Sequence, residues 1–225
     1  MENISQEKYE ELIHELYVCL CKDMEISPDL TINILRKRAF VAVMVSSRML
    51  GEFDENINSL YDSVLNYESV KRGIVKLEDI KFKKNMGFVI ADPFVFDVDV
   101  LVMFEKNLNP TSDMLNELFL RSGIKTKEEL FSILKRDNYL EKKLIPYIVD
   151  GGAIPSKKIA VILVDDIIKE SLIQCAKYLF DEIKEIKSVA FVLPKGCNEK
   201  IFTKTLGKCC KKISKKIKCI FIENL

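Results

Sequence analysis

The pattern of apolar positions separates a helical first third of the chain from a mixed remainder. Apolar residues recur at intervals of three and four over 5–24, 27–50 and 54–73, which predicts three amphipathic helices. Gly73 is typical of a helix end, because glycine adopts the backbone conformation that stops a helix. We therefore expect residues 1–73 to form a helical region.

After residue 73 the pattern is partly that of β-strands. The expected elements are strands at 74–77, 80–82, 87–91 and 94–104, and helices at 109–123 and from Thr126 onward. In the longest strand every second residue from Phe94 to Phe104 is apolar, which predicts one continuous buried face. Residues 74–150 are thus expected to form a mixed α/β region with a strand pair.

The last third, residues 151–225, has the clearest organisation. Continuous apolar runs alternate with helical patterns, in the order strand 158–164, helix 168–186, strand 188–193, helix 199–217 and strand 219–222. Such runs are typical of strands buried on both faces of a parallel sheet. The segment Gly151-Gly152 before them is the best linker candidate. We expect this β-α-β-α-β unit to form one compact body with 74–150.

The predicted architecture is therefore an α/β protein in which a helical N-terminal part packs on a Rossmann-like, mostly parallel sheet. A length of 225 residues with 48% hydrophobic and 31% charged residues fits a globular fold and excludes a disordered chain. No apolar run approaches the length of roughly 20 residues that spans a membrane. The first residues are polar and acidic, unlike a signal peptide, so we expect a cytoplasmic protein without a membrane partner.

Cysteine and histidine usage narrows the chemistry. The seven cysteines include no C-x-x-C pair, and an odd number in a chain without a signal peptide predicts free thiols. His14 is the single histidine, which argues against histidine-based triads and sites with two histidine ligands. We expect no structural metal.

Charge is distributed unevenly between the two ends of the sequence. Residues 1–70 carry 13 acidic and 6 basic groups, whereas residues 195–225 carry nine lysines and two glutamates. The last predicted helix has a row of lysines at helical spacing, Lys200, Lys204, Lys208, Lys211 and Lys215. This row could bind nucleic acid or an acidic partner, could attract the acidic end of the same molecule, or could be the solvated face of an outer helix. The helix has no arginine, and its aromatic Phe202 lies on the opposite, apolar side, so base-specific contacts are not indicated.

The carboxyl ends of the predicted parallel strands supply the candidate ligand-binding residues, because ligands of open α/β sheets bind at that edge. They are Asp165, Asp166, Lys195, Gly196 and Asn198. If 158–164 and 188–193 are parallel neighbours, Lys195 lies close to one of the two acids. An ammonium group and free N–H groups at a helix start suit a phosphate. The alternative is that Asp166 and Asn198 only cap helices.

The run 162–168, with its two acids Asp165 and Asp166, resembles the acidic strand end of type I phosphoribosyltransferases and phosphoribosyl-pyrophosphate synthetases. In those enzymes the acids contact the ribose hydroxyls and a Thr/Gly-rich loop holds the 5′-phosphate. The corresponding residues 169–172 contain no glycine, so the resemblance does not extend to the phosphate loop and does not imply the activity. Response-regulator receivers also begin with a strand that ends in two acids, but they need a third acid where this chain has Lys195.

Asp97 and Asp99 are a further acidic pair, expected on one face of the strand 94–104. Such a pair can hold Mg²⁺, and it can equally be a solvated face or protect a sheet edge. The sequence names no cofactor and does not decide whether the chain is an enzyme. The hypothesis it favours is a protein that binds a phosphorylated or nucleotide-like small ligand at the strand ends. The alternative is a non-enzymatic protein that binds nucleic acid or an acidic partner through its lysine row.

Overall fold

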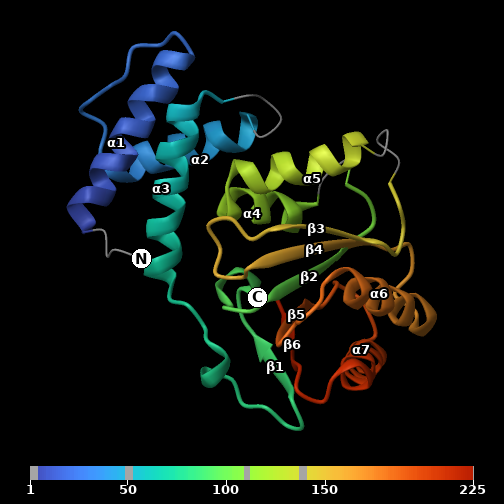
Figure 1. Ribbon diagram of the computed structural model, residues 1–225. Helices are drawn as coiled ribbons and strands as arrows, with labels where there is room; N and C mark the ends of the chain where they lie inside the picture. Colours follow the sequence, from blue (N-terminus) through green and yellow to red (C-terminus); the bar gives the residue numbers. More distant parts are fainter. Residues whose placement is uncertain (1–4, 49–52, 109–111, 137–140, 225) are drawn as a thin grey trace.

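The computed structural model describes residues 5–48, 53–108, 112–136 and 141–224 (Figure 1). Its helices are α1 (Gln6–Asp23), α2 (Ile34–Arg48), α3 (Glu55–Arg72), α4 (Asp113–Ser122), α5 (Ile124–Arg136), α6 (Lys169–Glu182) and α7 (Glu199–Ile213). Its strands are β1 (Met86–Ile90), β2 (Val100–Glu105), β3 (Pro146–Asp150), β4 (Lys158–Leu163), β5 (Ser188–Val192) and β6 (Lys218–Glu223). Within the described residues, no helix is both long and apolar enough to cross a membrane.

The six strands form one sheet in the order β1-β6-β5-β2-β4-β3. All neighbouring pairs are parallel except β3 with β4, which is antiparallel. Helices α4 and α5 cover one face of this sheet, and α6 and α7 cover the other (Figure 1). The predicted fold class, an α/β protein with a mostly parallel sheet and a helical N-terminal part, is confirmed.

Strand β2 lies in the middle of the sheet and contributes to the core on both faces. Leu101 and Met103 pack toward α4 and α5, whereas Val100 and Val102 pack toward α6 and α7. All four side chains are at most 1% exposed. Burial on both faces explains why this strand reads as a continuous apolar run.

Helices α1, α2 and α3 have a core of their own and rest on the α4–α5 layer rather than directly on the sheet (Figure 1). The phenol of Tyr61 in α3 donates a hydrogen bond to the carbonyl of Leu120 in α4. Ile124 at the start of α5 belongs to the same apolar cluster. The acidic helical part is thus joined to the sheet through one intervening helical layer.

The second helix begins later than the sequence predicted. Asp29 accepts hydrogen bonds from both the N–H and the hydroxyl of Thr31 and so closes a turn. Asn33 then accepts a bond from the N–H of Arg36, and α2 starts at Ile34. The prediction of a start at Ser27-Pro28 was wrong because these side-chain bonds stabilise a turn where the sequence also permits a helix.

The prediction that 158–164 and 188–193 are neighbouring strands was also wrong. Both are parallel strands, β4 and β5, but β2 lies between them and pairs with each. Two strand spacings amount to about 10 Å, roughly double the separation that adjacent strands would have. The helical crossover through α6 therefore passes over one strand, since β2 pairs with both β4 and β5 and lies between them.

The region before β2 contains less strand than expected. At 74–82 there is a short 3₁₀ turn, η1 (Leu77–Asp79), and a single bridge between Val75 and Phe96. The run 94–104 begins with a second 3₁₀ turn, η2 (Pro93–Val95), in which Asp92 accepts a hydrogen bond from the N–H of Phe94. Val98 is buried on the α4–α5 face of the sheet, whereas Val100 is buried on the α6–α7 face. The predicted apolar face of this run is therefore not continuous. Strand β3 was not predicted.

Gly151 and Gly152, expected to be a linker, form a closely packed connection between β3 and β4. A Cβ atom on Gly151 would lie 1.7 Å from the carbonyl oxygen of Ser156. One on Gly152, which has a φ of +61°, would lie 2.0 Å from the carbonyl oxygen of Ser122 at the end of α4. Both positions therefore require glycine because other backbone atoms approach closely.

Candidate functional site

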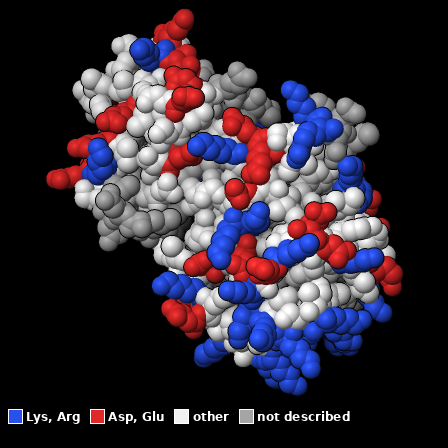
Figure 2. Space-filling model, in the orientation of Figure 1, with Lys and Arg blue, Asp and Glu red and all other residues white. Residues whose placement is uncertain are grey.

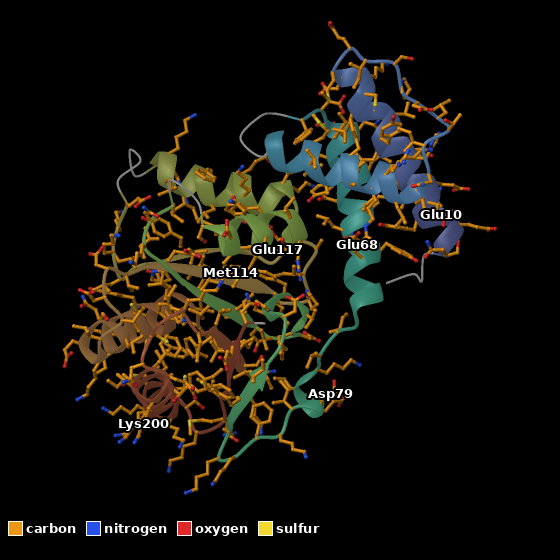
Figure 3. All side chains as sticks on the ribbon, turned by 180° about the vertical axis from the view of Figure 1, so that it is seen from behind. Glu10, Glu68, Asp79, Met114, Glu117 and Lys200 are labelled. Atoms are coloured by element: carbon orange, nitrogen blue, oxygen red, sulfur yellow. The ribbon has the colours of Figure 1, made fainter. Side chains whose placement is uncertain are left out.

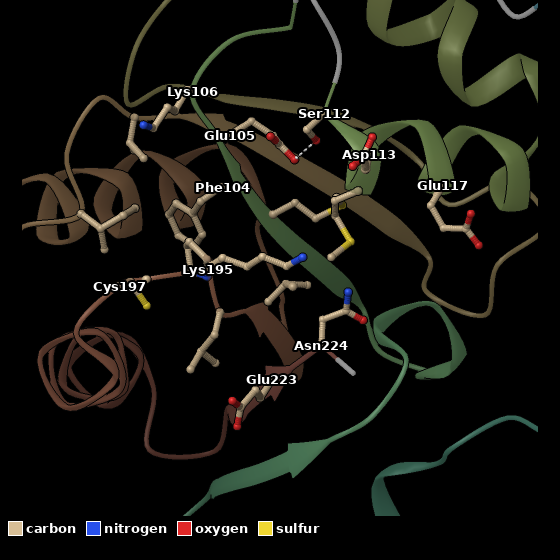
Figure 4. A pocket seen from close by; sticks show the side chains of 18 of the residues that line it. Phe104, Glu105, Lys106, Ser112, Asp113, Glu117, Lys195, Cys197, Glu223 and Asn224 are labelled. Atoms are coloured by element: carbon tan, nitrogen blue, oxygen red, sulfur yellow. Dashed lines mark hydrogen bonds between the residues drawn. The ribbon is translucent and has the colours of Figure 1, made fainter. Parts of the chain in front are cut away.

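A pocket of about 990 Å³ lies at the carboxyl edge of the sheet (Figure 4). The ends of β2, β4, β5 and β6 form its base, and the first turns of α4 and α7 stand on two of its sides. Among the described residues, none from the N-terminal helices lines it. The pocket therefore belongs to the sheet, at the edge where ligands of α/β proteins bind.

The lining combines an apolar floor with a rim of charged groups. The apolar part includes Phe104, Met114, Val164, Ile167 and Leu193. The Phe104 ring is held edge-on against the ring of Phe202, 5.3 Å away, so α7 fixes its orientation. A pocket of this size with an aromatic floor suits the flat, apolar part of a small ligand.

Glu105 at the end of β2 is a partly buried acid of the pocket. Its carboxylate accepts a hydrogen bond of 2.7 Å from the hydroxyl of Ser112, drawn in Figure 4. The same hydroxyl accepts a bond from the N–H of Leu115 and thereby caps α4. Burial raises the pKa of Glu105, and the bond from Ser112 opposes that shift. One serine therefore joins the end of the central strand to the start of a helix.

Cations are in the minority around the pocket, with Lys106, Arg121 and Lys195 facing seven carboxylates. Arg121 is engaged, since its guanidinium contacts the carboxylates of Asp92 and Glu117 and lies over the ring of Phe94. Lys195 is exposed and forms no ion pair with any described residue. Figure 4 shows its side chain extending from the β5–α7 loop across the pocket. Lys195 is therefore available to an anionic group.

The structure brings some of the predicted ligand-binding residues together and separates others. Asp165 and Lys195 both line the pocket, on either side of β2. The Asp165 side chain is 76% exposed and pairs with Lys143 at 3.1 Å. Gly196 also lines the pocket, from the loop between β5 and α7, and has a φ of +76°.

Asp166 and Asn198 lie outside the lining. Asp166 is exposed and does not cap α6, which begins after Ile168 with the support of Ser171. The Asn198 side chain accepts a hydrogen bond of 3.1 Å from the N–H of Ile201 and caps α7. The capping alternative is thus correct for Asn198 and wrong for Asp166.

Glu105, Ser112 and Arg121 were not among the predicted site residues. The signal for Glu105 was present, since a carboxylate ends an apolar run, but that run was not recognised as a parallel strand of the central sheet. Ser112 follows three residues outside the described part, and its role depends on Glu105 lying nearby in space. The position of β2 between β4 and β5 makes these residues central to the pocket.

Asp97 and Asp99 lie at the opposite, amino edge of the sheet, just before β2. Asp99 accepts hydrogen bonds from the N–H groups of Lys187 and Ser188 at 2.8 and 3.0 Å and pairs with Lys157 at 2.7 Å. Burial pushes its pKa upward, but these partners outweigh burial and lower the pKa of Asp99. Asp97 is exposed. Asp99 therefore holds the beginning of β5, and no group of three potential metal ligands exists among the described residues.

The lysine row of α7 is exposed, and the acidic helices do not cover it. Figure 3 places Glu10 on α1 and Lys200 on α7 at opposite ends of the molecule. Figure 2 shows basic side chains gathered over α7. The charge asymmetry of the sequence is thus not neutralised within one molecule, and binding of nucleic acid through this row stays a prediction.

No family model and no curated protein matches the sequence. Among solved structures, the fold is similar to the macro domain of ganglioside induced differentiation associated protein 2, with a TM-score of 0.53 and 13% identity over 68% of this chain and 89% of that one. It is also similar to a single-residue mutant of the Oceanobacillus iheyensis macrodomain, with a TM-score of 0.52 and 12% identity over 62% of this chain and 84% of that one. The same macrodomain solved with ADP gives a TM-score of 0.50 and 14% identity over 62% and 83%. At these identities the likeness extends to the fold, so this chain shares the α/β fold of the macrodomains.

Proposed function

We propose that the chain binds a nucleotide-like ligand carrying an adenosine diphosphate group in the pocket at the carboxyl edge of the sheet. The observation that carries this proposal is Lys195, a cation without an ion-pair partner among the described residues, extended over an apolar floor. The base and ribose would lie against Phe104 and its apolar neighbours, and the diphosphate beside Lys195. The solved ADP complex of a macrodomain with the same fold supports the choice of ligand.

The loop from β5 to α7 supports the same placement of the phosphates. It joins a parallel strand to the N-terminus of a helix, where the N–H groups and the helix dipole favour an anion. Gly196 in this loop has open space around the position of a Cβ atom, so the backbone can be approached closely. Most of the carboxylates that line the pocket lie on its other walls, although Glu199 stands in the first turn of α7, so an anionic group is favoured on this side.

Titration calorimetry with ADP, and in parallel with adenosine and ADP-ribose, tests the proposal. We expect ADP to bind more tightly than adenosine, because only ADP has the charge that Lys195 can neutralise. Lys195→Ala should weaken ADP binding by about 10- to 100-fold, since a hydrogen bond to a charged group contributes roughly 1.5–3 kcal/mol. Adenosine binding should change little in that variant.

The matched control is Lys200→Ala, which removes another exposed lysine that does not line the pocket. It should bind ADP as the parent protein does. A parent protein that does not bind ADP would contradict the choice of ligand. Equal losses in the two lysine variants would show a general charge effect and contradict the placement in the pocket.

A further inference from the structure

Strand β1 leaves one face uncovered at the edge of the sheet. Phe88 and Ile90 are 44% and 60% exposed, although both are large apolar residues within a strand. Phe88 is in register with Phe221 of β6, whose ring packs against Phe202 of α7. Phe88 and Ile90 therefore point to the α7 side of the sheet, where α7 covers β6 but not them.

The position of α7 relative to β1 is fixed by a close contact. Gly207 in α7 lies so near Met86 that a Cβ atom there would be 2.4 Å from the Met86 sulfur. A strand rises about 3.3 Å per residue and a helix about 1.5 Å, so two strand residues match about four helical residues. Because α7 runs opposite to β1, Phe88 lies level with about Thr203 and Ile90 with about Glu199, next to Lys204 and Lys200 of the lysine row.

Lysines therefore border the uncovered apolar face. Lys200, Lys204 and Lys211 are exposed, and none pairs with a carboxylate of the described residues. Lys204 and Lys211 lie three and four residues from Gly207, on the side of the helix that is turned toward β1. Figure 2 shows how densely basic side chains gather over this helix. The surface is apolar at its centre and mostly positive along its α7 side, while the exposed Glu223 of β6 is in register with Ile90.

We propose that this surface, formed by Phe88, Ile90, Lys200 and Lys204, docks an acidic amphipathic helix of a partner protein. Such a helix would lie beside α7 and continue the α6–α7 layer over β1, with its apolar stripe on Phe88 and Ile90. Its carboxylates would then face the lysines, and complementary charge would favour this class of partner over others. The phosphate backbone of a nucleic acid would contact the lysines and leave Phe88 and Ile90 uncovered.

The acidic helix α1 of a second copy of this chain does not fit this role. The apolar stripe of α1 is already buried in its own core, where Ile13, Leu16 and Leu20 are fully buried. Only its charged side remains outside, and a charged side cannot cover Phe88 and Ile90. The occupant therefore has to bring an apolar face of its own.

Fluorescence anisotropy with synthetic helical probes tests the proposal. The first probe is an amphipathic peptide of roughly 18 residues, about five turns, with leucines on one face and glutamates beside them. The second has lysines in place of the glutamates, and the third has the composition of the first in scrambled order. We expect the first probe to bind at least about tenfold more tightly than the others and to weaken as salt is added.

Two variants locate the binding, and each has a matched control. Phe88→Ser with Ile90→Ser, and separately Lys200→Glu with Lys204→Glu, should each weaken the first probe about tenfold, as expected for residues at the centre of an interface. Ile168→Ser, which changes another exposed apolar residue, and Lys177→Glu on the neighbouring α6 should leave binding unchanged. Lys195→Ala should also leave it unchanged, because this surface is separate from the pocket.

Failure of the first probe to bind, or binding that the Phe88 and Ile90 changes do not affect, overturns the proposal. A duplex DNA oligonucleotide provides the competing arm. If the DNA binds more tightly than the first probe and only the lysine changes weaken it, the surface is a general polyanion site and the proposal is wrong. Circular dichroism of each variant confirms that a lost signal is not lost folding.

Discussion

The two edges of the central sheet use their polar residues in opposite ways. At the amino edge, Asp99 satisfies two backbone N–H groups and a lysine, and its pKa is lowered. At the carboxyl edge, Glu105 has a single hydrogen-bond donor among the described residues and a raised pKa, and Lys195 has no ion-pair partner there. Polar groups thus stabilise the fold at one edge and are left available at the other, which is the division expected if ligands bind at the carboxyl ends.

Asp99→Ala is the change with the largest expected effect on stability. It removes the acceptor of two N–H groups, of the Ser188 hydroxyl and of the Lys157 ammonium, in a partly buried position. We expect the free energy of unfolding, measured with urea, to fall by about 2–3 kcal/mol. Binding of ADP at the other edge should not change.

Asp97→Ala is the control, because Asp97 is exposed at the same edge, and it should change stability by less than about 0.5 kcal/mol. The pH dependence gives a second check. Because the folded pKa of Asp99 is lowered from 3.8, its contribution is present above that value and is lost as the pH falls through the folded pKa. Equal losses of stability in Asp99→Ala and Asp97→Ala would contradict the stabilising role assigned to Asp99 at the amino edge.

Ser112→Ala is expected to have an intermediate effect at the carboxyl edge. It removes the cap of α4 and the hydrogen bond to Glu105 together. Loss of a cap costs about 1 kcal/mol, so urea denaturation should show a fall of that size. Ser132→Ala, which changes an exposed serine inside α5, is the control. If Ser112→Thr does not restore most of the loss, the cap is not its cause.

Glu105→Gln should produce the smallest effect, with the opposite sign. Burial raises the folded pKa of Glu105 above its ordinary 4.5, so the folded state disfavours the charged carboxylate. Stability therefore falls as the pH rises from about 4.5 through the folded pKa. The variant should be slightly more stable than the parent at neutral pH, by less than about 1 kcal/mol because the group is partly solvated. This gain should disappear below that range.

Glu223→Gln, which changes an exposed acid at the same edge, is the control and should leave stability unchanged. A parent protein that is less stable than Glu105→Gln only below pH 4.5 would reverse the assigned sign. If Glu105→Gln is more stable than the parent at neutral pH and also binds ADP more weakly, the comparison becomes sharper. The Glu105 charge would then destabilise the fold and contribute to ligand binding.

Local features of the fold were predictable from the sequence because neighbouring residues cause them. Gly73 takes a φ of +80° after α3, and Asn198 caps α7, as the residue types indicated. The alternation of strands and helices after residue 157 was predictable for the same reason. The period of apolar residues reports which face of an element is buried.

The arrangement of the candidate site was not predictable because it depends on strand order. Apolar periodicity does not state which strands are neighbours, and β2 pairs with strands that follow it by some 60 and 90 residues. Placing β4 beside β5 led to a site centred on Asp165 and Lys195, without the acid that lies between them. Glu105 enters the pocket only through this non-local pairing.

The strand order also has a consequence for the sequence of events in folding. Met86 pairs with Cys219, so the first strand of the sheet acquires its neighbour β6 from a segment made more than 130 residues later. Contacts of such long separation close slowly, because the loop must lose its entropy before the pairing stabilises anything. During synthesis the helices of the first third can associate while β1 still lacks a partner. The pocket, lined by residues from Asp92 to Asn224, can then form only after β6 has left the ribosome.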